Sequence, residues 1–282
     1  MLNIFILIIS SIPLLSLALN QKGMKFCNFP TPTSTETIST TMNIVKDTDF
    51  GNKRIIFNGK PNTCQPNIPG WNNDWDHAIF VEDGVTISNL ILGESPIGTS
   101  SDIVCRGDCK LKNVYIENTC WRGFSFIEAA DATPGEKEHR KYNYVVEGGA
   151  ALDGFQKIMV QGGPGRTTVK NFCSVNNSMG IISAGSCSQQ YSRKITVSDS
   201  RFMGPMLTIF DGNRQYNDKL ILGNIEIYGN NNPSTKIDYV CSEYPGEIAP
   251  ASDRWKYAYK PGEAGTSDKF CNYPDTAVKI IN

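Results

Sequence analysis

The stretch from Val146 to Phe172 reads VEGGAALDGFQKIMVQGGPGRTTVKNF. It contains two short apolar runs, and glycine-rich corners at 148–149 and 162–165 bound them. Runs this short, flanked by glycine, are typical of strands rather than helices, because glycine supplies the positive φ that a tight corner needs. The stretch therefore predicts a strand, a corner, a second strand and a second corner.

The end of this stretch recurs along the chain, with an Asn or Asp at one point of each copy. These anchor residues are Asn89, Asn113, Asn171, Asp199 and Asn224. The steps between them are 24, 58, 28 and 25 residues. One unit is about two dozen residues, as in a solenoid, and the long step fits two units plus an insertion, which the charged segment 129–142 would supply.

A repeat of this length with short strands predicts an all-β fold, a right-handed parallel β-helix, in which each coil packs only on its neighbours. An Asn at the same bend of each coil can stack on the next Asn. The alternative is an antiparallel sandwich, whose turns do not usually share one residue at constant phase. We expect the solenoid over residues 20–245 and a tail, 246–282, that packs on it or caps it.

The first 19 residues predict export. Leu2 to Leu19 form an apolar run with small residues near its end, which indicates a signal peptide at 1–19, with an uncleaved signal anchor as the alternative. The formal net charge of −1 provides no basic stripe for nucleic acid. We therefore expect a secreted, extracellular monomer with no nucleic-acid partner and no membrane contact after signal cleavage.

Nine cysteines agree with export, since most cysteines pair in an oxidising compartment and an odd count leaves one over. Cys105, Cys109 and Cys120 have a spacing that resembles a metal site. No histidine lies close to them, so we expect disulfides rather than zinc. Cys271 would tether the tail.

Several motifs in this chain resemble the small pectate lyases of polysaccharide lyase family 3. They are FPTPT (29–33), EDGVTISNL (82–90), CRGDC (105–109), NVYIE (113–117), GGA (148–150), Lys157 with its following glycine corner, QYSR (190–193), YND (216–218) and IYGN (227–230). They span about residues 25 to 245 in the family's order. The resemblance implies a secreted β-helix that acts on pectic polysaccharide, either polygalacturonate or pectin.

The resemblance also implies a reaction. The family cleaves polygalacturonate by β-elimination: a base takes the proton at C5 and the C4 oxygen leaves, while Ca²⁺ with Lys and Arg stabilises the carboxylate. Of the family's cationic set only Lys157 is clearly kept. The calcium pair aligns with Trp121 and Arg122, and the family Asp with Ser101, one residue before Asp102. Other cationic positions align with Ile127, Met179 and Ile182.

Three hypotheses follow for the site. In the first, the family reaction with calcium is kept, with Asp102, Glu117 or Glu128 as weak candidate ligands, although an Arg at a cation site repels Ca²⁺. In the second, the protein is a lyase without metal. Arg122 would pair with a uronate carboxylate, Trp121 would stack on the sugar, and Lys157 would act as base or second clamp.

In the third hypothesis the protein is a catalytically silent relative that binds pectic chains or serves as a secreted interaction protein. Arg193, which follows Tyr191 at the start of a coil, is a further candidate for substrate binding. His77 and His139 lie far apart and have no evident partners in the sequence, so they suggest neither a histidine mechanism nor a metal site.

Overall fold

The computed structural model describes residues 22–66, 77–127, 140–185, 190–244 and 256–282. The predicted signal peptide, most of the predicted insertion, Glu128, His139 and Cys187 lie outside the described residues. Residues 22–26 are helical, and a short 3-10 turn, η2, covers Asp275–Ala277. The strands are β1 (Thr35–Ile38), β2 (Met42–Ile44), β3 (Thr48–Phe57), β4 (Ile79–Val81), β5 (Val85–Gly93), β6 (Ile103–Arg106), β7 (Cys109–Ile116), β8 (Cys120–Ile127), β9 (Tyr142–Glu147), β10 (Ala150–Gln161), β11 (Gly165–Lys170), β12 (Cys173–Ser183), β13 (Arg193–Met203), β14 (Met206–Asn213), β15 (Lys219–Tyr228), β16 (Ile237–Tyr244), β17 (Ala258–Tyr259), β18 (Gly265–Thr266), β19 (Asn272–Tyr273) and β20 (Val278–Ile281).

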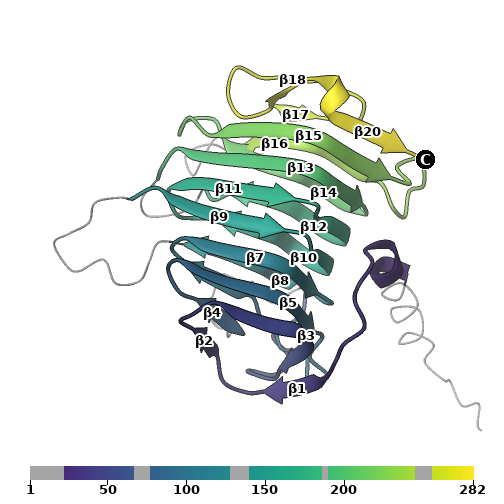
Figure 1. Cartoon of the computed structure of the whole chain (residues 1–282). Coiled ribbons are helices and arrows are strands. Elements are labelled where there is room, and N and C mark those ends of the chain that lie inside the picture. The colour runs from purple at the N-terminus through teal and green to yellow at the C-terminus, as the bar shows by residue number, and fades with distance from the viewer. Residues whose placement is uncertain (1–21, 67–76, 128–139, 186–189, 245–255) are drawn as a thin grey trace, which may run out of the picture.

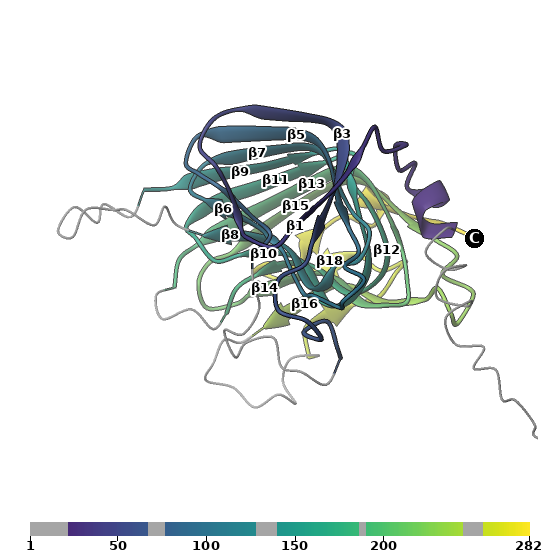
Figure 2. The same cartoon turned by 90° about the horizontal axis from the view of Figure 1, so that it is seen from below.

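The strands form the coils of a parallel β-helix (Figure 1). One face consists of β1, β3, β5, β7, β9, β11, β13, β15 and β20, each parallel to the next. A second face consists of β2, β4, β6, β8, β10, β12, β14 and β16, again parallel throughout. Figure 2, which looks along the stack, shows the coils superposed around one core. The predicted right-handed parallel β-helix is confirmed, and the antiparallel sandwich is excluded.

The five anchor residues all lie at left-handed bends, with φ between 51° and 55°. Their side chains stack between coils: the Asn113 amide donates to Asn89 Oδ1 at 3.0 Å, and the Asn224 amide donates to Asp199 Oδ1 at 3.1 Å. In the 58-residue step between Asn113 and Asn171, Gly148 forms the corresponding bend, with φ 72°. A Cβ at Gly148 would lie 2.4 Å from Asn113 Oδ1, so this coil has room only for glycine.

The core is built from rows of residues that pair across successive coils. Phe124, Met159, Ile181, Phe210 and Cys241 form one such row on β8, β10, β12, β14 and β16. All five are at most 1% exposed, and burial of each large apolar side chain contributes about 1.5–3 kcal/mol. Because side chains alternate along a strand, the next residue on each of these strands points outward, and that second row forms the floor of the site.

Four disulfides link segments of the described chain. They join Cys27 to Cys173, Cys64 to Cys120, Cys105 to Cys109, and Cys241 to Cys271. The expectation of disulfides rather than zinc is therefore confirmed for the closely spaced cysteines. The C-terminal residues contribute β20, which pairs with β15, and β17, which runs antiparallel to β16. Within the described ranges, no helix is long and apolar enough to cross a membrane.

Candidate functional site

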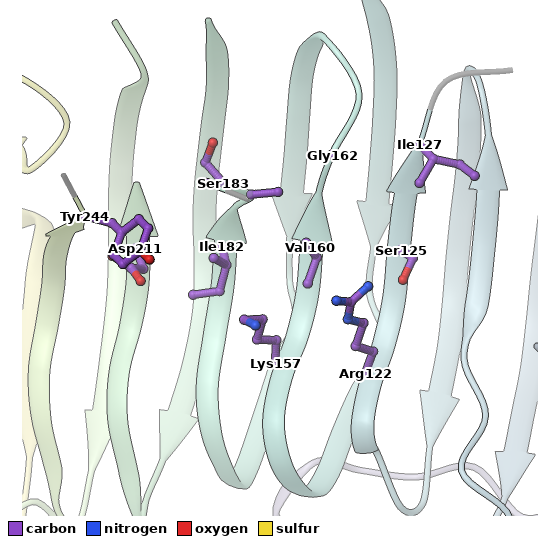
Figure 3. A pocket seen from close by; sticks show the side chains of 12 residues that line it. Arg122, Ser125, Ile127, Lys157, Val160, Gly162, Ile182, Ser183, Asp211 and Tyr244 are labelled. Carbon is purple, nitrogen blue, oxygen red and sulfur yellow. The ribbon is translucent and has the colours of Figure 1, made fainter. Parts of the chain in front are cut away.

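A groove with a volume of about 350 Å³ crosses the outer side of β8, β10, β12 and β14 (Figure 3). Arg122 enters it at one end, Lys157 enters it from the neighbouring strand, and Asp211 lies at the other end. The residues that line it are Arg122, Ser125, Ile127, Lys157, Val160, Gly162, Ile182, Ser183, Ala184, Gly185, Asp211 and Tyr244. The groove thus contains Arg122 and Lys157 together with Ile127 and Ile182, two of the positions at which the resemblance indicates substitution.

Arg122 and Lys157 are direct strand partners on β8 and β10. Neighbouring strands are about 4.8 Å apart, and both side chains enter the same groove (Figure 3). Lys157 Nζ also donates to Gln156 Oε1 at 3.4 Å. Two cations on neighbouring strands can bind one carboxylate from two sides, with the guanidinium supplying a bidentate pair of N–H donors.

The floor of the groove is a row of four strand partners, Ser125, Val160, Ile182 and Asp211. Val160 and Ile182 make its middle apolar. Asp211 is 2% exposed, and its Oδ1 accepts a hydrogen bond from Ser242 Oγ at 3.1 Å. Asp211 is not among the site residues predicted from the sequence, because nothing in the sequence near it distinguishes it from a turn residue.

A hydrogen-bonded chain of three side chains lies behind the cationic end. Ser125 Oγ donates to Asp102 Oδ2 at 2.6 Å, and His77 Nδ1 lies 2.5 Å from Asp102 Oδ1. The hydrogen bond to Asp102 raises the pKa of His77, while burial and the positive charge of Arg122 act in the opposite direction. The conclusion that His77 is unaccompanied was therefore wrong.

Arg193, which the sequence suggests as a candidate for substrate binding, has a buried side chain. It is 1% exposed. Its guanidinium donates to the carbonyl of Gly162, at 3.1 Å from Nε and 2.7 Å from Nη2, and to the carbonyl of Ala184 at 2.8 Å. Because Gly162 and Ala184 both line the groove, Arg193 supports the groove rim from inside.

Trp121 does not offer a face to a sugar. It is 5% exposed and packs edge-on against Phe155, with ring centroids 6.3 Å apart. Glu117 is likewise withdrawn from the groove: it is 6% exposed, pairs with Arg54 and accepts the Glu94 backbone N–H at 3.0 Å. Both expectations, Trp121 as a stacking platform and Glu117 as a calcium ligand, are corrected by this burial.

Comparison with known proteins identifies the family of this chain. The pectate lyase family model matches residues 27–249. The chain belongs to the pectate lyase family. It is 25% identical over 233 residues to probable pectate lyase D of Emericella nidulans, covering 82% of this chain and 79% of that one. It is 26% identical over 220 residues to probable pectate lyase F of Aspergillus flavus, covering 77% and 83%.

Solved pectate lyase structures share the fold. The catalytic domain of pectate lyase PelI from Erwinia chrysanthemi superposes with a TM-score of 0.61 at 19% identity, covering 89% of this chain and 98% of that one. Pectate lyase PelI in complex with tetragalacturonic acid superposes with a TM-score of 0.59 at 19% identity, covering 89% and 71%.

The described residues around the groove of this pectate lyase family member do not fit a calcium ion, although the family is generally calcium-dependent. Ca²⁺ takes six to eight oxygen ligands. Both carboxylate oxygens of Asp102 are bonded within the chain, and Arg122 and Lys157 place positive charge in the groove. The part of the chain that the structure describes contains no cluster of three or more His, Cys, Asp or Glu side chains able to hold a metal.

Proposed function

We propose that this pectate lyase family member binds pectic polysaccharide in the groove and that Arg122 and Lys157, rather than calcium, bind the uronate carboxylate. One observation carries the proposal: these two residues are strand partners on neighbouring coils and line the same groove. A guanidinium and an ammonium side by side supply donors to both oxygens of one carboxylate. The apolar side chains of Val160 and Ile182 offer a surface to the sugar ring.

We also propose that the protein acts outside the cell. Four disulfides within the described residues suit an oxidising compartment, and the apolar N-terminal run supports export through a signal peptide at 1–19. We propose a monomer.

Binding tests the proposal directly. Arg122→Gln should weaken binding of the purified protein to polygalacturonate or pectin by about tenfold to a hundredfold, since charge-assisted hydrogen bonds contribute about 1.5–3 kcal/mol. Arg166→Gln is the matched control, because Arg166 is exposed on β11, on a different face. Chelator should leave the wild-type affinity unchanged. Loss of binding in chelator, or equal binding by the two variants, would contradict the proposal.

A second candidate function is β-elimination without metal. It is favoured by Lys157, the cationic residue kept from the family pattern, which lies beside Arg122 in the groove. An uncharged Lys157 amine would take the C5 proton, the bond from C4 to its oxygen would break, a C4–C5 double bond would form, and water would return a proton to the leaving oxygen. Ultraviolet absorbance of the unsaturated product, measured with and without chelator, separates a lyase from a binder. Lys157→Met should abolish any chelator-resistant product.

A further inference from the structure

A second hollow lies beside the groove on the same strands. Its volume is about 420 Å³, and ligand pockets usually measure roughly 300–1,000 Å³. On β10, Gly154 and Phe155 line this hollow, whereas Lys157 and Val160 line the groove. On β12 and β14, too, the residues of the hollow precede those of the groove. Because the three strands are parallel, the hollow adjoins the groove on the side where Lys157 lies (Figure 3).

Phe155 lies in this hollow at a β-bulge. From Gly154 to Lys157, β10 takes three steps, whereas β8 takes two steps between the residues paired with them. A bulge of this kind redirects side chains and is common next to active sites. Phe155 is 42% exposed, and its ring meets that of Trp121 edge-on. An aromatic ring therefore lies at the surface two residues before Lys157.

Apolar side chains form the walls of the hollow. Pro205, Leu207 and Pro233 line it together with Phe155. Single exposed apolar side chains are ordinary on a protein surface, but an aromatic ring in a hollow with apolar walls is typical of a binding site. The C–H face of a pyranose ring can lie flat on such an aromatic ring, and this contact removes apolar surface from water.

Polar groups in the same hollow match the hydroxyls of a sugar. Asn176 and Ser178 contribute an amide and a hydroxyl. An amide carries two donors and an acceptor, so Asn176 can bond a ligand while its Nδ2 also donates to Asp153 Oδ1 at 2.6 Å. The two charged residues that line the hollow, Lys236 and Asp238, pair with each other at 2.8 Å. The hollow therefore combines an apolar surface with hydrogen-bonding groups, which suits a sugar unit.

We propose that Phe155 is a substrate-binding residue. Its ring stacks on one sugar unit of the pectic chain whose carboxylate is bound by Arg122 and Lys157, the role for which the sequence suggested Trp121. Phe155 lies roughly 6–7 Å from Lys157 along β10 at the usual rise of a strand, so nearby units of one chain can reach both residues. This inference rests on the proposed binding of a uronate by the two cations.

The test compares galacturonate monomer, titrated by ligand-observed NMR, with a galacturonate hexamer, titrated by calorimetry, both in chelator. The monomer can occupy only one position at a time, whereas the hexamer can span the groove and the hollow. The wild type should therefore bind the hexamer at least tenfold more tightly, the effect of burying roughly 55 Å² of apolar surface. Phe155→Ala should remove most of this difference by weakening binding of the hexamer.

Phe155→Tyr keeps a flat ring and should keep the wild-type preference for the hexamer. Ile221→Ala is the matched control, because Ile221 is an apolar residue, 47% exposed, on β15 and thus on the other face. This control should change neither affinity. Phe155→Ser provides a second variant if Phe155→Ala does not fold.

The two proposals fail in different ways. If the wild-type protein binds neither probe, or if Arg122→Gln binds both probes as the wild type does, the proposed function itself is overturned. If binding depends on Arg122 but the wild type shows no preference for the hexamer, the role of Phe155 is overturned. A Phe155→Ala variant that keeps the wild-type preference, or that weakens binding of both probes to the same extent, overturns it equally.

Discussion

Replacing Arg193 with Met should lower the free energy of unfolding by about 3 kcal/mol. The guanidinium is the hydrogen-bond donor for the carbonyls of Gly162 and Ala184. Methionine would leave both carbonyls without this donor, and each buried unsatisfied acceptor costs about 1–3 kcal/mol. The two costs sum to about 2–6 kcal/mol, and removing a buried charge recovers part of this cost, which leaves an expected loss in the lower half of that range.

Urea unfolding followed by far-ultraviolet circular dichroism measures this loss, with Arg166→Met as the control. Arg166 is exposed, so its replacement should change the free energy by no more than about 0.5 kcal/mol. Arg193→Lys should fall between the two, because lysine keeps the charge but lacks the planar fork of donors. If Arg193→Met and Arg166→Met behave alike, Arg193 does not support the groove rim.

Two further perturbations test other contacts. The hydrogen bond to Asp102 raises the pKa of His77 above its ordinary value of 6.5, so the folded protein holds this proton more tightly than the unfolded chain does. The resulting stabilisation is complete below pH 6.5 and is lost as the pH rises through the raised pKa. The urea midpoint of the wild type should therefore fall over this pH range, and His77→Asn should flatten that part of the plot of urea midpoint against pH. An unaltered slope in the variant would contradict the pairing of His77 with Asp102. Gly149→Ala should cost at least about 2 kcal/mol, because φ is 89° there and a Cβ would lie 2.1 Å from the Val114 carbonyl oxygen. Gly223→Ala, whose Cβ would meet no atom nearer than 3.9 Å, should be close to neutral, and equal urea midpoints for the two glycine variants would refute the expected clash.

The fold was predictable because its decisive feature is local and repeated. Asn89, Asn113 and the other anchors adopt a left-handed bend that few residue types tolerate, and the bend recurs once per coil. The direction of Trp121 was not predictable. The residue before it, Cys120, is also at a left-handed bend, with φ 52°, and a cysteine carries no sequence signal for such a corner. The indole of Trp121 is buried directly after this bend.

The contacts of Arg193 could not be predicted from the sequence either, since its hydrogen-bond acceptors are main-chain carbonyls that any residue would supply. The chain of His77, Asp102 and Ser125 is different. These residues are separated by 25 and 23 residues, close to one repeat, and in a solenoid residues one repeat apart lie side by side. Polar residues recurring at the repeat length were therefore a usable signal for this cluster.

The ladder of anchor bends has a consequence for how such a protein can change over time. Asn113 bonds the bend before it at Asn89, and Asn224 bonds the bend before it at Asp199. Contacts of this kind join neighbouring coils, so duplication or deletion of a whole coil would leave most contacts as they were. The groove does not share this tolerance. Its lining side chains are contributed by successive coils, from β8 to β14, and the number of those coils sets which side chains lie next to one another. Gain of one coil between β8 and β10 would thus preserve the architecture while separating Arg122 from Lys157.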